Sequence, residues 1–213
     1  MKEKFKQFFN DFIKFPVYVL FHPFDGYEDF KRFKKGKLWV AITYLVLFAI
    51  LGVLQIQYNG FIINDVNPKE INSLKQIFSV ILLVVLFVVG NWSVTTLMEG
   101  KGNMKEILMV TGYSLLPIVL IGYPSILISR FVTLEEVGLY KLILGIGYFA
   151  TGWMLFMGIL NIHEYGLGKT IAAFFLTVVS MLVMIFVALL FFDLIQQFLS
   201  FIKMIWRELN LRL

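Results

Sequence analysis

The chain has 213 residues, 59% of them hydrophobic and 15% charged, and it carries a formal net charge of +5. Because soluble domains contain about 25% charged and about 45–50% apolar residues, this composition excludes an ordinary soluble domain and predicts an all-α integral membrane protein. The chain has no cysteine and only two histidines, His22 and His163. This excludes disulfides, thiolate or histidine-rich metal sites and a cysteine nucleophile.

Residues 1–37 form a predicted cytoplasmic segment that is amphipathic first and basic afterwards. Between Lys2 and Leu20 the apolar residues recur at helical spacing opposite polar ones, which is typical of a helix lying on a membrane surface. Packing of this helix against the protein's own loops is the alternative. The sequence His22-Pro23-Phe24-Asp25-Gly26 then predicts a helix break and a turn. A short basic helix follows, and five cations are expected to attract anionic lipid headgroups: Lys31, Arg32, Lys34, Lys35 and Lys37.

Residues 38–192 contain five stretches long enough to cross a membrane. A spanning helix needs about 20 mainly apolar residues, because the hydrocarbon core is about 30 Å thick. In the third stretch, Pro117 and Pro124 each remove a backbone donor and predict a kink or a break. In the fourth, Gly138, Gly145 and Gly152 recur every seven residues and predict a face for close helix packing. The five predicted spans are 38–58, 77–97, 107–129, 139–160 and 170–192.

Residues 193–213 form a predicted second amphipathic helix, which either lies at the interface or extends the fifth span. With five crossings, twelve of the 19 Lys and Arg residues fall on the side of the N-terminus, and nine of these precede the first span. Because Lys and Arg concentrate on the cytoplasmic side, we predict a cytoplasmic N-terminus and an outside C-terminus.

Uncharged polar residues mark the second span. Such groups are costly in lipid unless they find partners, so we expect them to face the bundle and to bond across helices. They are Asn91, Ser93, Thr95 and Thr96. A substrate path along this span and the kinked third span is the alternative, and it would make the chain a permease or a channel-like transporter.

Patterns of familiar catalytic sites are incomplete in this chain. The segment 166–170 ends like a phosphate-binding P-loop, but His163 stands where that motif needs its first glycine, and a spanning helix precedes it instead of a strand. The pair His163-Glu164 lacks the second histidine of a zinc peptidase and is interpreted as a solvated loop pair. No carboxylate pair lies within a span for acid–base chemistry. We therefore predict no enzymatic activity, no cofactor and no nucleic-acid partner.

Two short stretches carry a family resemblance. In the first, 97–102, Gly100 and Gly102 allow a tight turn after the second span. The second is the sequence Gly112-Tyr113-Ser114-Leu115-Leu116-Pro117 in the third span. Over about residues 20–195 the chain resembles the Yip domain family, multi-pass membrane proteins named in eukaryotes for interacting with Rab-type GTPases. The resemblance implies a family motif made of Gly100, Gly102, Gly112, Tyr113, Ser114 and Pro117.

The segment before the first span differs from that of eukaryotic members. It lacks their long N-terminal region and acidic stretch, so Rab binding is not carried over, and residues 22–26 look more like bacterial members. Some bacterial members accompany membrane transport systems, including carbohydrate importers of the ABC type. The resemblance therefore implies a bacterial plasma-membrane protein. The leading hypothesis is a non-enzymatic scaffold or accessory subunit. Its partners would be the lipid bilayer and other integral membrane proteins, with ABC transporter subunits as candidates, and a homo-oligomer is compatible with these features.

Overall fold

The computed structural model describes residues 2–64 and 72–212, and all regular structure within these ranges is helical. Residues 1, 65–71 and 213, which include the outermost ends of both predicted terminal segments, lie outside the described part. Five helical segments are long and apolar enough to cross a membrane, by length and composition. The prediction of an all-α membrane protein with five spans is therefore confirmed.

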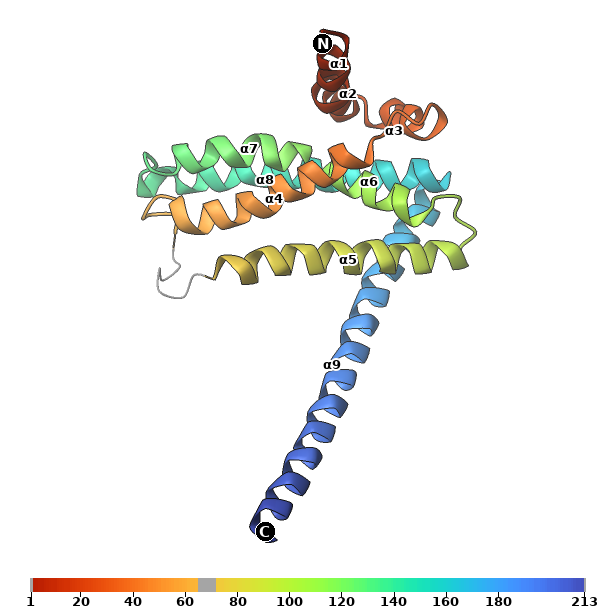
Figure 1. Ribbon diagram of the computed structural model, residues 1–213. Coiled ribbons are helices and arrows are strands. Elements are labelled where there is room, and N and C mark those ends of the chain that lie inside the picture. The colour runs from red at the N-terminus through yellow and green to blue at the C-terminus, as the bar shows by residue number, and fades with distance from the viewer. Residues whose placement is uncertain (1, 65–71, 213) are drawn as a thin grey trace.

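The helices α4 to α8 lie side by side in a bundle (Figure 1). The first span is α4, Leu38–Tyr58, with the predicted bounds, and the second is α5, Ser73–Leu97. The second begins earlier than predicted because the Asn72 side chain caps it and accepts the Lys75 N–H at 3.0 Å. The fourth span is α8, Val137–His163, and it follows the short 3₁₀ helix η3, Leu134–Glu136.

The third span is interrupted and central. It consists of α6, Met104–Ser114, and α7, Leu116–Ile128, and the break falls at Leu115, just before Pro117. Proline has no N–H to continue the helix ladder, and the Leu115 N–H bonds back to the Gly112 carbonyl at 3.2 Å. Pro124, by contrast, lies inside α7 without interrupting it. In the most apolar part of this span 72% of the residues are buried, more than in any other span.

A helical arm precedes the bundle. It comprises α1 (Lys2–Phe9), the π-helix η1 (Asn10–Lys14), α2 (Phe15–Phe21) and α3 (Pro23–Arg32). The first three form one continuous helix, because the backbone stays helical through both junctions, and His22 ends it. The predicted turn at Asp25-Gly26 is wrong, because both residues lie within α3. Gly26 is needed for another reason: a Cβ there would lie 2.8 Å from the Val19 Cα, since α2 and α3 pack closely.

In the amphipathic helix of the arm, some apolar side chains pack against the protein and others are exposed. Phe12 stacks against Trp39 and Tyr44 of α4, and its carbonyl accepts the Tyr44 hydroxyl at 2.6 Å. Phe8 and Ile13 remain exposed by 51% and 42%. One side of this helix therefore packs against the protein, and its contact with a membrane surface stays a prediction.

Helix α9, Leu167–Arg212, contains both the fifth span and the predicted C-terminal helix. It has no break between residues 192 and 193, so the C-terminal segment extends the fifth span as one 46-residue helix. Its beginning packs against α5, and the rest leans away from the bundle (Figure 1). Only 6% of its most apolar window is buried, so this helix leaves most of its surface uncovered.

The glycine stripe of α8 faces away from the bundle. A Cβ on Gly138, Gly145 or Gly152 would meet nothing within 4 Å, so the prediction that these glycines pack closely within the protein is wrong. Gly147 and Gly158, on the other side of the helix, make the close contacts instead. Spacing showed that a small-residue stripe exists, but not which side of the helix the neighbours occupy.

Candidate functional site

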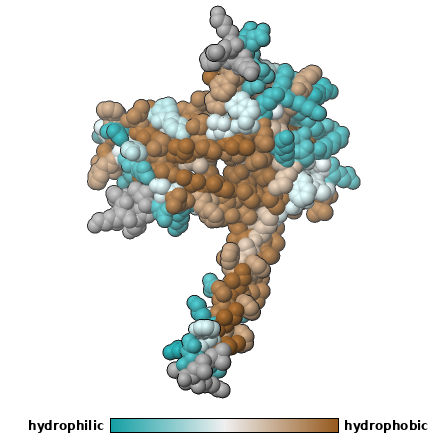
Figure 2. Space-filling view, viewed as in Figure 1, coloured by the Kyte–Doolittle hydropathy of each residue, from teal (hydrophilic) through white to brown (hydrophobic). Residues whose placement is uncertain are grey.

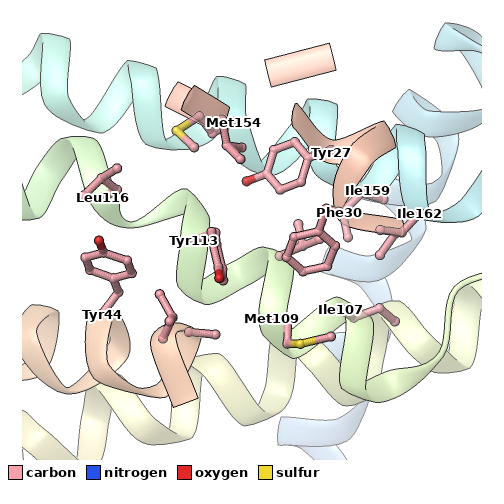
Figure 3. Close-up of a cluster of buried hydrophobic side chains, with 14 of the residues drawn as sticks. Tyr27, Phe30, Tyr44, Ile107, Met109, Tyr113, Leu116, Met154, Ile159 and Ile162 are labelled. Carbon is pink, nitrogen blue, oxygen red and sulfur yellow. The ribbon is translucent and has the colours of Figure 1, made fainter. Parts of the chain in front are cut away.

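The sequence Gly112 to Pro117 lies at the centre of the molecule, and Tyr113 is its most enclosed residue. The Tyr113 side chain has no exposed surface and lies between Phe30 of α3 and Tyr44 of α4 (Figure 3), with Phe15 of α2 as a third aromatic neighbour. Its ring centroid is 5.3 Å from Phe30, 6.0 Å from Phe15 and 6.3 Å from Tyr44, each in an edge-to-face arrangement. Its hydroxyl accepts the Lys37 backbone N–H at 3.1 Å. Tyr113 therefore joins the arm and the start of α4 to the central helix.

Ser114 makes a second connection between the arm and the central helix. Its hydroxyl lies 2.8 Å from the hydroxyl of Tyr27 in α3, and both side chains are almost fully buried. Burial raises the pKa of Tyr27 well above its usual value, so the phenol stays protonated. The pair satisfies two polar groups that would otherwise be costly in the interior.

Gly112 lies at a close contact between α6 and α4. A Cβ added there would lie 2.5 Å from the Ala41 carbonyl oxygen and 2.7 Å from the Ala41 Cα. Only glycine permits this backbone approach. The consecutive residues Gly112, Tyr113 and Ser114 thus contact α4, the aromatic cluster and α3 respectively.

Gly100 and Gly102, the other motif glycines, form a turn that closes on the loop between α8 and α9. A Cβ on Gly100 would overlap the imidazole of His163 and the hydroxyl of Tyr165, and the Gly102 N–H donates to His163 Nδ1 at 3.2 Å. His163 is only 1% exposed and stacks on Tyr165. Its interpretation as part of a solvated loop pair is therefore wrong. Sequence spacing could not show that two loops 60 residues apart meet here.

Glu164 connects this turn to the arm. Its carboxylate accepts Lys31 Nζ from α3 at 2.8 Å and pairs with Lys101 from the glycine turn. Lys31 also donates to the Ile162 carbonyl at 2.8 Å. The hydrogen bonds from Lys101 and Lys31 lower the pKa of Glu164 to about 2. We call Lys31, Lys101 and Glu164 the loop clamp, because they join three segments at the end of the bundle.

The loop clamp predicts an acid-sensitive contribution to stability. Because folding lowers the pKa of Glu164 from its ordinary 4.5 to about 2, this contribution is complete above pH 4.5 and is lost as the pH falls towards 2. We expect Glu164→Gln to melt at a lower temperature than the parent chain at pH 6, with the difference shrinking as the pH falls through this range. Glu135→Gln, at an exposed glutamate, is the control and should match the parent throughout. A difference that stays constant with pH would contradict the loop clamp.

Three of the five cations in the predicted basic cluster form ion pairs with carboxylates. Lys31 belongs to the loop clamp, Arg32 pairs with Glu28 at 2.9 Å, and Lys35 pairs with Asp29 at 2.6 Å. For the side chains of Lys34 and Lys37, no carboxylate in the described ranges lies within ion-pair distance. Lys34 and Lys37 line a cavity together with Lys105 of α6. The sequence analysis did not include Lys105 in the basic cluster.

The expectation that the polar residues of the second span bond across helices is correct for Asn91 and wrong for Ser93, Thr95 and Thr96. Asn91 is fully buried and donates to the Thr177 hydroxyl of α9 at 3.0 Å, as the expected bond across helices. The hydroxyls of Ser93, Thr95 and Thr96 instead bond to carbonyls of their own helix. Of the four side chains, only Asn91 bonds to another helix.

Comparison with protein families matches the chain to the Yip1 domain over residues 17–192. This range runs from within α2 to the end of the fifth predicted span, and it includes the glycine turn, the loop clamp, and Tyr113 with Phe30 and Tyr44. Neither the curated proteins nor the solved structures gave a match.

Proposed function

The chain belongs to the Yip1 domain family, and on that premise we propose that it is a non-enzymatic scaffold or accessory subunit of a membrane complex. The buried polar groups around the family motif support this proposal, because they are used for joining helices. Ser114 bonds to Tyr27, and His163 accepts the Gly102 N–H. These groups hold segments together rather than meeting at a cavity where a substrate would bind.

Helix α9 is the observation that carries the proposal. At 1.5 Å per residue its 46 residues extend about 69 Å, more than twice the thickness of a hydrocarbon core of about 30 Å. A single crossing therefore leaves about half of the helix outside the core. That part exposes Phe198, Phe201 and Trp206, which are 63%, 58% and 68% exposed. Apolar surface of this extent is typical of an interaction site.

The partner we propose is another integral membrane protein. The outward glycine stripe of α8, at Gly138, Gly145 and Gly152, allows a second helix to approach within the bilayer. The resemblance to bacterial family members implies an association with transport systems, so we take the membrane subunits of a carbohydrate ABC importer as the first candidates. We place the chain in a bacterial plasma membrane with the N-terminus inside, because the Lys and Arg residues concentrate on that side.

A permease along the second and third spans has less support. Such a path needs polar groups facing an open space, but Asn91 is covered by Thr177, and the neighbouring hydroxyls bond to their own helix. The break at Leu115 is filled by the aromatic cluster around Tyr113.

Photo-cross-linking along α9 tests the scaffold proposal. A photoreactive residue at Phe198 or Phe201 in the full chain, irradiated in its own membranes, is expected to join α9 to one membrane polypeptide of defined mass. The matched controls carry the same residue at Gln197 or Lys203, which are polar positions of the same segment, and should give little product.

The products also identify the partner. A product of twice the chain mass identifies a second copy, and a larger or smaller one a different subunit. Products joined only to lipid at all four positions would overturn the proposal.

A further inference from the structure

A cationic cavity opens where the linker between α3 and α4 meets the first turns of α4 and α6. Its volume is about 640 Å³. Its lining includes three lysines, Lys34, Lys37 and Lys105, and the apolar side chains of Trp39 and Met109. Two spanning segments begin here, so the cavity lies at the boundary between the apolar bundle and the hydrophilic surface seen at this end (Figure 2).

The cavity has an excess of positive charge. Lys31 also lines it, but its ammonium group is taken by Glu164. The one carboxylate in the wall, Glu106, accepts the Asn103 backbone N–H at 3.0 Å and so caps its own helix. Across the described part of the chain, no acidic group lies within ion-pair distance of the other three ammonium groups. An anion in this cavity would meet three cations without displacing an existing ion pair.

An apolar groove begins beside the cavity and follows the first predicted span. Ile42 lines both, and Leu108 of the groove is next in sequence to Met109 of the cavity. The groove, of about 500 Å³, runs between α4 and α5 and is lined only by Ile, Leu, Val and Ala side chains. From Ile42 to Ile50 it follows about 12 Å of α4, at 1.5 Å per residue. Openings in the apolar face between these helices are visible in Figure 2.

We propose that this cavity and groove form a binding site for one anionic phospholipid, with the phosphate at Lys34, Lys37 and Lys105 and an acyl chain in the groove between α4 and α5. The shape requires a ligand with an anionic head and a long apolar tail joined at the membrane boundary. A free phosphate would leave the groove empty, and an uncharged lipid would leave the three cations without a counter-charge. Ile42 and Val46, 45% and 50% exposed, leave the groove open sideways to the bilayer. This inference is independent of the partner proposed above.

Lipid retention by the purified full chain tests the site. The protein in mild detergent is incubated with equal amounts of phosphatidylglycerol and phosphatidylcholine bearing the same acyl chains, and native mass spectrometry counts the lipids that remain bound. We expect one retained phosphatidylglycerol. The triple variant Lys34→Gln, Lys37→Gln, Lys105→Gln should bind it about ten- to a hundred-fold more weakly.

Two controls separate this site from general charge and from the headgroup alone. Lys6→Gln, Lys14→Gln and Lys203→Gln together remove the same charge from exposed positions outside the cavity and should retain the lipid. Glycerol 3-phosphate, which has the anionic head without the chains, should not compete at millimolar concentration. Equal retention of the two lipids, an equal loss in the control triple variant, or displacement by glycerol 3-phosphate would each overturn the proposal.

Discussion

Replacing Tyr113 by alanine is expected to lower the free energy of unfolding by about 3–5 kcal/mol, the range for a buried aromatic side chain truncated to alanine. The ring has no exposed surface and contacts Phe15, Phe30 and Tyr44, so its removal leaves a cavity where three other elements meet α6. The loss is measured on the full chain in mixed micelles, by titration with a denaturing detergent.

Two variants separate the contribution of the Tyr113 ring from that of its hydroxyl. Tyr113→Phe keeps the ring but leaves the Lys37 N–H without its acceptor, and it should cost about 1–3 kcal/mol. Tyr148→Ala makes the same truncation at a side chain that is 53% exposed on α8, and it should change stability little. If Tyr148→Ala and Tyr113→Ala prove equally destabilising, the proposed role of the cluster is wrong.

The second large effect is expected from Gly112→Ala. One methyl group at this position would overlap the backbone of Ala41, which cannot rotate away as a side chain can. Helices α4 and α6 must therefore separate, and we expect a loss of about 3 kcal/mol, at the upper end for overpacking. The same detergent titration measures it.

Gly145→Ala is the matched control for Gly112→Ala. Its Cβ would meet nothing within 4 Å, and alanine favours a helix interior over glycine by about 0.5–1 kcal/mol. We therefore expect this variant to be as stable as the parent chain or slightly more stable. A destabilisation equal to that of Gly112→Ala would mean that the loss does not depend on the close contact with Ala41, because alanine is favoured over glycine in both helices.

The sequence alone predicted the features that local chemistry determines. Long apolar runs place the five spans because lipid leaves few alternatives to a helix, and the α4 bounds agree at both ends. Pro117 predicted the break, because a proline cannot continue the hydrogen-bond ladder. The two motif stretches predicted the family that the Yip1 domain match then supported.

The features that sequence reasoning missed depend on contacts between distant segments. His163 stands beside a loop, and nothing in its neighbours showed that the turn at Gly100 and Gly102 would cover it. Asp25-Gly26 has the chemistry of a turn, but packing of α3 against α2 keeps it helical. For the α8 glycines, periodicity identified a stripe, while only the position of α7 and α6 determines which side is inside.

The contact between the arm and α8 has a consequence for how the protein is made. Lys31 and Glu164 are 133 residues apart, so the arm leaves the ribosome long before its docking surface exists. At about 5–20 residues per second, the delay is roughly 7–27 seconds. During that interval α4 already covers Phe12, while Phe8 and Ile13 keep much of their surface exposed. We therefore expect the amphipathic helix to lie on the bilayer surface until α8 is synthesised, so that the loop clamp closes late in translation.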